Sequence, residues 1–329
     1  MSNFLLNSAT RHQIFLQRYA GGRARNATKA LNRLRRAVVS RLRAGPSEFR
    51  RDRLTYLLED IDQLISNGFG DISNVLREEM HDLAVSEADF ARKMVLKSLG
   101  VEFVLPSDAA LTASVDGSIM GNLDVNIEDA LRELTTKKRN QVANMITDGV
   151  TIGDSPEDIV TKVNTVMATL HRRQVQSLVR TAVNHVSSVA RKELYVTNSR
   201  LIDGFEVVAT LDGHTTLICG TRDGDIYPAE VGPYPPYHWG CRTTTTPAVK
   251  GRAPVGTRPS ATGEVKGNVT YGSWLKEQPI EFIEEALGRE RALLFRQGKL
   301  PLEKFVDPTG RVYTLRQLES MNPFVFQES

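Results

Sequence analysis

Apolar residues recur at helical spacing along most of this chain. Within residues 23–44 they fall every three or four positions, which places them on one narrow face of a helix. This stripe consists of Ala27, Leu31, Leu34, Val38 and Leu42. Similar stripes over residues 54–65 and 72–99 predict two further helices, each with an apolar face turned inward.

Glycine positions predict where the first helices end. The pair Gly21-Gly22 is expected to separate the 23–44 helix from an apolar arm over residues 4–20. The stretch Asn-Gly-Phe-Gly at 67–70 is expected to stop the second helix. The N-terminal half is therefore predicted as several helices of moderate length.

The second half begins as helix and changes character near residue 200. Helices are predicted over residues 124–147, 157–170 and 171–197. Residues 205–210 alternate and are β-branched, which predicts a strand, and the four threonines at 243–246 predict extended chain. The fold class is therefore mainly α with a small α+β module, a helical N-terminal body followed by an irregular, strand-containing domain.

Changes in composition divide the chain into five predicted parts. A stretch rich in Gly, Pro, Ala and Thr separates the strand-containing region from a patterned tail. The parts are residues 1–53, a basic N-terminal arm and helix; 54–150, a helical body; 151–250, the strand-containing module; 251–268, a linker or loop; and 269–329, a C-terminal helical tail.

The net charge of +3 conceals a strong asymmetry. Residues 1–53 carry 13 Arg and Lys against 2 Asp and Glu, a balance of +11, whereas the remaining residues carry 29 against 37, a balance of −8. A basic segment on an acidic body predicts contact with a polyanion such as DNA, or with an acidic protein surface. The residues expected to make this contact lie on the polar face of the 23–44 helix: Arg25, Lys29, Arg33, Arg36 and Arg43.

Other features of the sequence indicate the compartment in which the chain is made and folds. No apolar run approaches the length needed to cross a bilayer, so we expect no membrane partner. The first residues lack a charged leader, and two cysteines in 329 residues do not suggest a disulfide scaffold. We therefore expect synthesis and folding in a cytoplasm.

The segment 212–242 gathers the side chains with the most reactive chemistry. It contains both cysteines of the chain, Cys219 and Cys241, and His238 precedes Cys241 by three positions. Zinc in structural sites takes four ligands of these types, and a His-x-x-Cys pair is suitably spaced to supply two of them. Candidate fourth ligands are His214 and Asp212.

The same residues allow other interpretations. Strong zinc motifs contain paired Cys-x-x-Cys units, so the pattern favours a buried histidine and two small thiols that stabilise a tight loop. We therefore expect no cofactor, with zinc as the alternative. A nucleophilic cysteine with His238 as base is another alternative, although no orienting third group lies at a recognisable spacing. Asp223 and Asp225 resemble a fragment of a calcium loop, but the following ligands are missing, which indicates a turn.

A series of motifs in a fixed order suggests a family. The motifs are Leu178-Val-Arg180-Thr181 on a helix, Asn184, Leu211-Asp212, Thr216, Cys219, Asp223-Gly224 and Pro235-Pro236-Tyr-His238-Trp-Gly-Cys241-Arg242, with Tyr271-Gly-Ser-Trp274 in the tail. Over about residues 155–320 this order resembles the head-morphogenesis module of tailed-phage minor head proteins, the Mu F-like group. The resemblance implies that the module is built on these core residues: Arg180, Thr181, Asp212, Asp223, Gly224, Pro236 and Arg242.

The chain departs from the family pattern at three positions. Arg222 replaces the second cysteine of a Cys-x-x-Cys, Thr243 replaces a final cysteine, and Ala182 replaces the glutamate of Arg-Thr-Glu. A family metal site built on all of those cysteines would be incomplete here. The resemblance therefore implies a loop held mainly by packing and hydrogen bonds.

The resemblance also implies a function. It predicts a structural, non-enzymatic minor head protein of the virion, made in the bacterial host cytoplasm and active in head assembly near the portal or the inner capsid surface. Its expected partners are the portal protein or the major capsid protein, with packaged double-stranded DNA as a further partner. The alternatives are a nucleic-acid-binding or ejected virion protein, and a toxin-like hydrolase.

Overall fold

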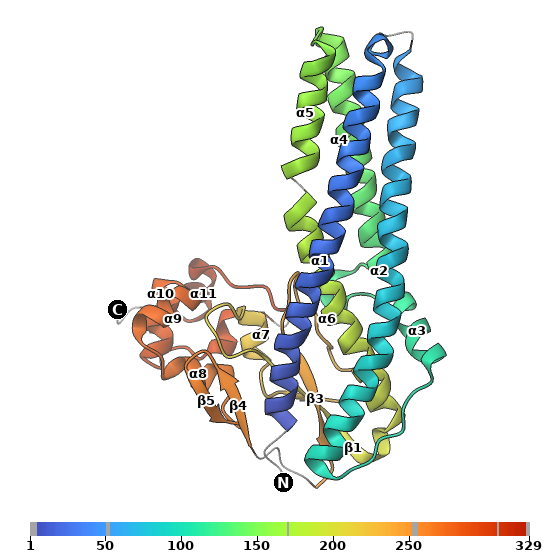
Figure 1. Cartoon of the computed structure of the whole chain (residues 1–329). Coiled ribbons are helices and arrows are strands. Elements are labelled where there is room, and N and C mark those ends of the chain that lie inside the picture. Colours follow the sequence, from blue (N-terminus) through green and yellow to red (C-terminus); the bar gives the residue numbers. More distant parts are fainter. Residues whose placement is uncertain (1–4, 51–52, 170, 252–255, 308, 327–329) are drawn as a thin grey trace.

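The computed structural model describes residues 5–50, 53–169, 171–251, 256–307 and 309–326, which form a long helical stalk on a broader base (Figure 1). The long helices are α1 (Leu5–Ala44), α2 (Leu54–Leu99), α4 (Ile127–Ile152), α5 (Pro156–Thr169) and α6 (His171–Thr197). The upper parts of α1 and α2 form the stalk together with α4 and α5, and α6 runs from the lower stalk into the base (Figure 1). The chain is thus mainly α-helical with a small β module, as predicted.

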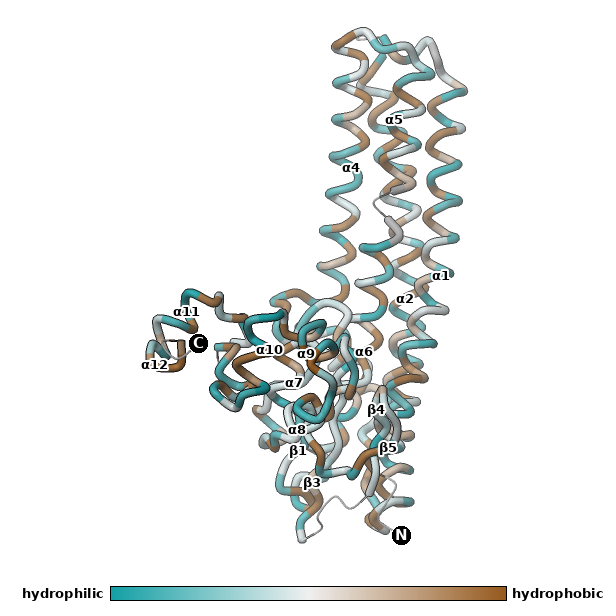
Figure 2. Tube along the Cα trace, turned by 90° about the vertical axis from the view of Figure 1, so that its left-hand side faces the viewer, coloured by the Kyte–Doolittle hydropathy of each residue, from teal (hydrophilic) through white to brown (hydrophobic). Residues whose placement is uncertain are grey.

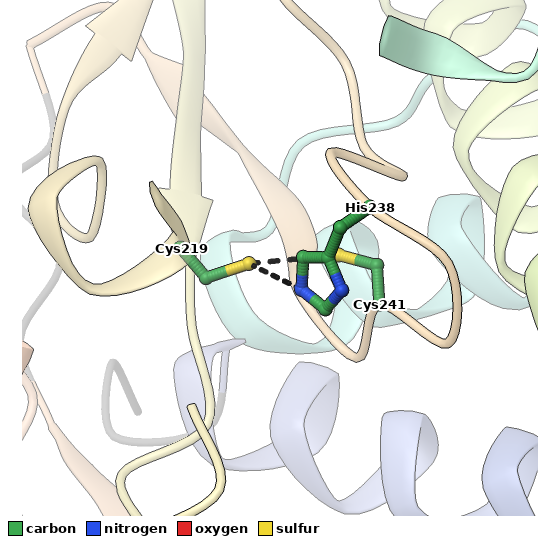
Figure 3. Close-up of side chains that lie close together, drawn as sticks. All are labelled: Cys219, His238 and Cys241. Atoms are coloured by element: carbon green, nitrogen blue, oxygen red, sulfur yellow. Dashed lines mark hydrogen bonds between the residues drawn. The ribbon is translucent and has the colours of Figure 1, made fainter. Parts of the chain in front are cut away.

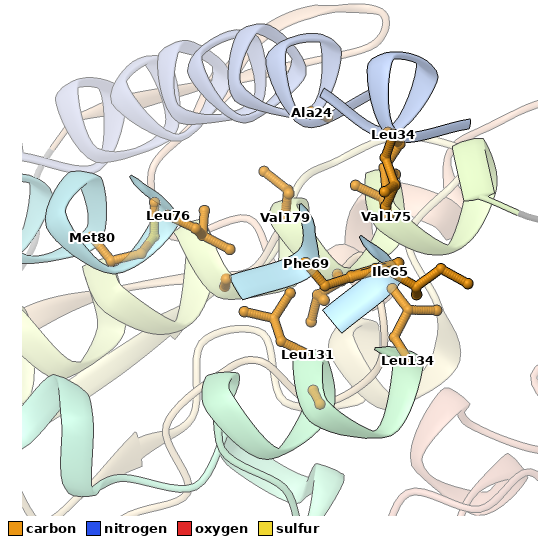
Figure 4. Close-up of a cluster of buried hydrophobic side chains, with 14 of the residues drawn as sticks. Ala24, Leu34, Ile65, Phe69, Leu76, Met80, Leu131, Leu134, Val175 and Val179 are labelled. Atoms are coloured by element: carbon orange, nitrogen blue, oxygen red, sulfur yellow. The ribbon is translucent and has the colours of Figure 1, made fainter. Parts of the chain in front are cut away.

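Apolar side chains from α1, α2, α4, α5 and α6 pack into one core that holds the stalk together. Hydrophobic and hydrophilic positions alternate along each stalk helix (Figure 2), as expected when one face of each helix is buried. In Figure 4, Leu34 of α1, Phe69 of α2, Leu131 of α4 and Val175 of α6 converge on one cluster. Leu34 belongs to a predicted stripe, and Leu131 and Val175 lie in predicted helices, whereas Phe69 lies in the stretch that was expected to stop the second helix.

The predicted break at Gly21-Gly22 is wrong, because α1 continues through both residues. A glycine in a helix interior costs about 1 kcal/mol relative to alanine, so an isolated helix would be weakened here. The buried face nevertheless passes through the pair without interruption, since Leu16, Ala20 and Ala24 are all buried in the bundle. Packing against neighbouring helices therefore outweighs the local propensity.

The predicted stop at residues 67–70 is also wrong, because α2 is continuous over this stretch. Phe69 is buried in the core of the stalk. A Cβ atom added at Gly68 would lie 2.7 Å from a methyl carbon of Leu34 on α1. Gly68 therefore allows close approach of two helices rather than a chain break.

The base contains a three-stranded antiparallel sheet in the order β2-β1-β3. The strands are β1 (Ile202–Val208), β2 (Ile226–Tyr227) and β3 (Thr244–Val249). Strand β1 begins three residues before the predicted strand, and the threonine run at 243–246 enters β3 as expected. Helix α6 packs on this sheet, where its Leu194 and Tyr195 share a core with Phe205.

The stretch predicted as a linker or loop contains a β-hairpin, formed by β4 (Thr257–Ser260) and β5 (Gly263–Lys266). The C-terminal tail is helical, as expected, and forms its own small core around Trp274 and Phe305. Whether the five predicted parts are independent domains stays a prediction. The remaining elements are η1 (Pro46–Glu48), α3 (Asp108–Gly117), η2 (Gly121–Leu123), η3 (Ser199–Leu201), α7 (Leu217–Thr221), α8 (Tyr271–Lys276), α9 (Ile280–Leu287), α10 (Arg289–Arg296), η4 (Leu302–Phe305), α11 (Leu315–Met321) and α12 (Pro323–Phe326).

Candidate metal centre and its clamps

The two cysteines and His238 come together in the base, between α7 and the loop that precedes β3 (Figure 3). The Sγ atom of Cys219 lies 3.2 Å from Nε2 of His238 and 3.7 Å from Sγ of Cys241. One ligand atom from each of the three residues lies within 4.8 Å of the others. The structure therefore brings together the three side chains that the sequence singled out as candidate metal ligands.

Two tight turns present these side chains. Helix α7 starts after Thr216, whose carbonyl oxygen accepts a hydrogen bond from the backbone N–H of Cys219 at 3.0 Å. On the other side, the backbone N–H of Cys241 donates to the carbonyl of His238 at 3.1 Å, and Gly240 adopts a φ of 75°. A positive φ favours glycine, which has no Cβ to clash with the backbone. The His-x-x-Cys pair thus forms one compact turn.

The ring of His238 has a defined orientation. Its Nδ1 atom lies 3.0 Å from the carbonyl oxygen of Trp239, an acceptor, so Nδ1 carries the proton in this hydrogen bond. In the neutral ring the lone pair of Nε2 then faces the sulfur of Cys219. This is the arrangement in which a histidine binds a metal ion through Nε2.

Burial and hydrogen bonding set the acidity of the cluster. The hydrogen bond to Cys241, together with burial, raises the pKa of Cys219 well above its ordinary value. Burial would also raise the pKa of Cys241, but the hydrogen bonds with Cys219 and with His238 in its protonated form outweigh burial and hold that pKa well below the ordinary value. The thiolate is the form of cysteine that binds metals and attacks electrophiles.

An ion pair fastens the cluster loop to the segment that follows β1. The guanidinium of Arg242 donates two hydrogen bonds of 2.6 Å to the two carboxylate oxygens of Asp212. Burial would raise the pKa of Asp212, but Arg242 outweighs burial and keeps this pKa below its ordinary value. Because Arg242 occupies both oxygens, Asp212 serves as a clamp residue rather than as the fourth metal ligand that the sequence suggested.

A second, fully buried pair joins the cluster region to the hairpin. Arg258 of β4 donates to both carboxylate oxygens of Asp223, at 3.0 and 3.1 Å. The same carboxylate accepts backbone hydrogen bonds from Ala209 at 2.7 Å and Tyr271 at 2.6 Å. Asp223 therefore ties β1, the hairpin and α8 together, which is more than the turn predicted for it. The neighbouring Gly224 has a φ of 88°, as a tight turn requires.

Helix α6 contributes Thr181, another predicted core residue of the module. Its buried hydroxyl accepts a hydrogen bond of 2.8 Å from the backbone N–H of Gly240, inside the His-x-x-Cys turn. Pro236 lies on the same loop and accepts a hydrogen bond of 3.3 Å from the backbone N–H of Asn122. Arg180, by contrast, is exposed on α6. Two of these three motif residues thus hold the loop in place.

Sequence reasoning missed Arg258 and the surroundings of the cluster. Arg258 is a single arginine in a stretch with linker composition, so no pattern marked it as buried. Arg222, which replaces a family cysteine, stacks on the ring of Tyr237 with its guanidinium carbon 4.5 Å from the ring centre. Thr243, which replaces another, is buried beside the cluster. Both replacements take up structural contacts of their own.

The predicted basic stripe lies on the stalk, away from the cluster. Arg25, Lys29, Arg33 and Arg36 are exposed along α1. Within the described part of the chain, no carboxylate forms an ion pair with any of the four. The fifth predicted residue, Arg43, pairs with Glu157 of α5 at 2.7 Å. Four of the five cations are therefore available to an external partner.

Fold and site together define a mainly α-helical protein with a compact, internally clamped α+β module. Residues 140–246, about a third of the chain, match the family model described as Phage Mu protein F like protein. This region runs from the second half of α4 into β3 and includes the three clustered ligands, so this part of the chain is similar to the Phage Mu protein F-like family. No curated protein and no solved structure matches the chain significantly.

Proposed function

We propose that this chain is a structural minor head protein of the virion, which acts in head assembly at the portal or on the inner surface of the shell. The observation that carries the proposal is the Mu F-like match over residues 140–246. In this proposal the base is the interaction module, and the portal protein or the major capsid protein is its partner.

The architecture supports a structural role over an enzymatic one. The cavity beside the cluster measures about 30 Å³, which is room for about one water molecule and too small for a substrate. A hollow of about 490 Å³ lies between the stalk helices, but apolar residues of the bundle such as Leu31, Phe69 and Val179 dominate its lining. Among the described helices, none combines the length and apolar character that spanning a membrane requires.

Incorporation into particles tests this proposal. Heads purified from cells infected by the phage that encodes the chain, or from an induced lysogen, should contain it after removal of loosely bound protein with high salt. Immunoblotting of gradient fractions should place the chain in the head peak. Its complete recovery at the top of the gradient, with none in heads, would contradict the proposal.

A second role, contact with packaged double-stranded DNA, is favoured by one observation. The four cations Arg25, Lys29, Arg33 and Arg36 form an exposed row on α1 without intramolecular ion pairs among the described residues. Binding by such a row depends on counterion release, so its affinity should fall steeply with salt.

Removing the four positive charges of this row should weaken DNA binding. Replacing all four residues by alanine should weaken binding of the purified chain to a DNA duplex by at least tenfold at low salt. It should also make the slope of log affinity against log salt concentration less steep by up to about 3.6, which is about 0.9 for each lost phosphate contact. Fluorescence anisotropy with a labelled duplex measures both quantities. The matched control removes four exposed cations of the C-terminal region: Lys266, Lys276, Lys304 and Arg316.

The outcome separates two kinds of partner. An equal loss of affinity in both quadruple variants would contradict a specific role of the stalk row in DNA binding. The absence of any salt-dependent DNA binding by the wild-type chain would contradict it as well and would favour an acidic protein surface as the target of this row.

A further inference from the structure

We propose that Cys219, His238 and Cys241 bind one Zn²⁺ ion, with a water molecule at the fourth position, and that this ion locks α7 to the loop before β3. The inference rests on the geometry of the three side chains. It does not depend on the proposed role in the phage head.

The ligand atoms already have nearly the spacing of a zinc site. Tetrahedral zinc with Zn–S bonds of about 2.3 Å and a Zn–N bond of 2.0–2.1 Å places two sulfurs about 3.8 Å apart and sulfur and nitrogen about 3.5 Å apart. The observed separations are 3.7 Å between the two sulfurs and 3.2 Å between Sγ of Cys219 and Nε2 of His238. All three ligand atoms lie within 4.8 Å of one another, so side-chain adjustments without a change of fold would admit the ion.

The residues behind the ligands are arranged as a metal site requires. Metal-binding histidines commonly donate their second ring N–H to a carbonyl or carboxylate, which orients the ring. His238 makes this contact to Trp239. Thr181 fixes the turn between His238 and Cys241 by accepting the N–H of Gly240. Both ligand turns are therefore held in position by hydrogen bonds that do not involve the metal.

A small polar cavity borders two of the three ligands, Cys219 and His238. Its volume of about 30 Å³ suits one water, and the polar residues Thr210, Thr215 and Thr216 line it beside Cys219. Asp212 is engaged by Arg242, which removes it from the ligand set. His214 also lines the cavity but is exposed and lies outside the group of clustered ligand atoms. These observations favour water over a fourth protein ligand.

Zinc is the metal that this donor set favours. Two thiolates and one imidazole are soft and borderline ligands, which exclude magnesium and calcium as the preferred ions. The two cysteines are free, and their sulfurs are separated by more than the 2.05 Å of a disulfide. The ion would join positions 219 and 241, the same two chain segments that the Asp212–Arg242 pair connects.

Metal analysis of the full-length chain tests the proposal. The protein, purified in reductant and dialysed against micromolar zinc and then metal-free buffer, should retain one zinc per chain by inductively coupled plasma mass spectrometry. Replacing zinc by Co²⁺ should produce the sulfur-to-cobalt charge-transfer absorption of thiolate ligands. Cys219→Ser and His238→Ala should each lower zinc affinity at least tenfold in competition with a chromogenic chelator.

Measurements on the wild-type chain and on His214→Ala test the proposal even if Cys219→Ser or His238→Ala fails to fold. Chelation should lower the melting temperature of the wild-type chain, measured by circular dichroism, and added zinc should restore it. His214→Ala should keep wild-type zinc affinity, because water fills the fourth position. Three results would each overturn the proposal. The wild-type chain could be folded, with two titratable thiols, and retain no zinc. Reductant-free protein could contain a Cys219–Cys241 disulfide that persists in the presence of zinc, or the chain could bind another metal in preference to zinc. A loss of affinity in His214→Ala equal to that in His238→Ala would overturn the water ligand.

Discussion

At the scale of single residues, buried carboxylates join separate parts of the chain through hydrogen bonds and ion pairs. Glu87 of α2 is buried and accepts hydrogen bonds from Ser187 of α6 at 2.6 Å and from the ring of His12 on α1 at 2.5 Å. Arg191 lies 3.8 Å from the same carboxylate and donates to the carbonyl oxygen of Thr245 in β3 at 2.6 Å. One carboxylate therefore links three helices, and through Arg191 it reaches the sheet.

This network predicts a pH dependence of stability. Burial would raise the pKa of Glu87, but the hydrogen bond and charge of His12, helped by Arg191, outweigh burial and hold this pKa below its ordinary value. A carboxylate whose pKa is lowered by folding stabilises the protein above its unfolded pKa of about 4.3, and this contribution is lost as the pH falls through the folded-state pKa. Glu87 thus contributes at neutral pH and ceases to contribute in acid.

Glu87→Gln should therefore destabilise the chain at pH 7 by roughly 3–5 kcal/mol, the cost of breaking a buried ion pair. Urea unfolding followed by circular dichroism at pH 7 and at about pH 3.5 measures the effect. The gap between variant and wild type should narrow in acid. Glu59→Gln, at an exposed position of α2, is the control and should change neither value. A constant gap at both pH values would contradict this role of Glu87.

The sequence singled out the acidic residues of such contacts in the cluster region but not all of their partners. Asp212, Asp223 and the cluster ligands stood out because they lie within 31 residues of one another in a segment rich in turns. The partner of Asp223 outside that segment, Arg258 in the hairpin, lies in a stretch of linker composition and was missed. Thr181 on α6 was identified only through the resemblance to the family. A single arginine becomes a buried ion-pair partner only when the fold brings a carboxylate to it, and periodicity carries no information about that event.

At the scale of elements, apolar periodicity was a better guide than glycine. The stripes around Leu34 and Leu76 correctly predicted helices and the faces that they bury. Gly21 and Gly68 were interpreted as breaks, yet both lie inside long helices. Helix propensity is a local quantity of about 1 kcal/mol per glycine, whereas burial of the bundle face acts along the whole helix. The hairpin at 257–266 was missed because its Gly, Pro and Thr content is equally typical of a loop.

Two glycines of α2 provide a matched test of this explanation. Gly70 is exposed, and a Cβ added there meets nothing within 4 Å, so Gly70→Ala should raise stability by about 0.5–1 kcal/mol through helix propensity. Gly68→Ala has the same propensity gain, but its Cβ would lie 2.7 Å from Leu34, and overpacking typically costs about 1–3 kcal/mol. Urea unfolding should rank Gly70→Ala above wild type and Gly68→Ala below it. Equal stabilisation by both substitutions would show that Gly68 has no packing role.

At the scale of the whole molecule, the first helix connects the stalk with the last third of the chain. Near its N-terminal end, Asn7 and Arg11 both contact Glu264 of the hairpin at 3.1 Å, across more than 250 residues of sequence. Farther along the same helix lies the exposed basic row. The charge asymmetry predicted a basic N-terminal module but not its position, because contacts at such sequence separation leave no local pattern. The resulting layout presents the cationic surface on the stalk and the Mu F-like core in the base.

The central claim is that head assembly requires this chain as a structural part, and removal of the chain tests it most directly. A nonsense codon early in its gene should sharply reduce the yield of infectious particles, and wild-type protein supplied in trans should restore that yield. His238→Ala and Cys219→Ser alter only the candidate metal centre. The yield of infectious particles with each of these variants therefore tests the zinc proposal separately from the requirement for the chain. Normal yields of infectious particles in the complete absence of the chain would contradict the account.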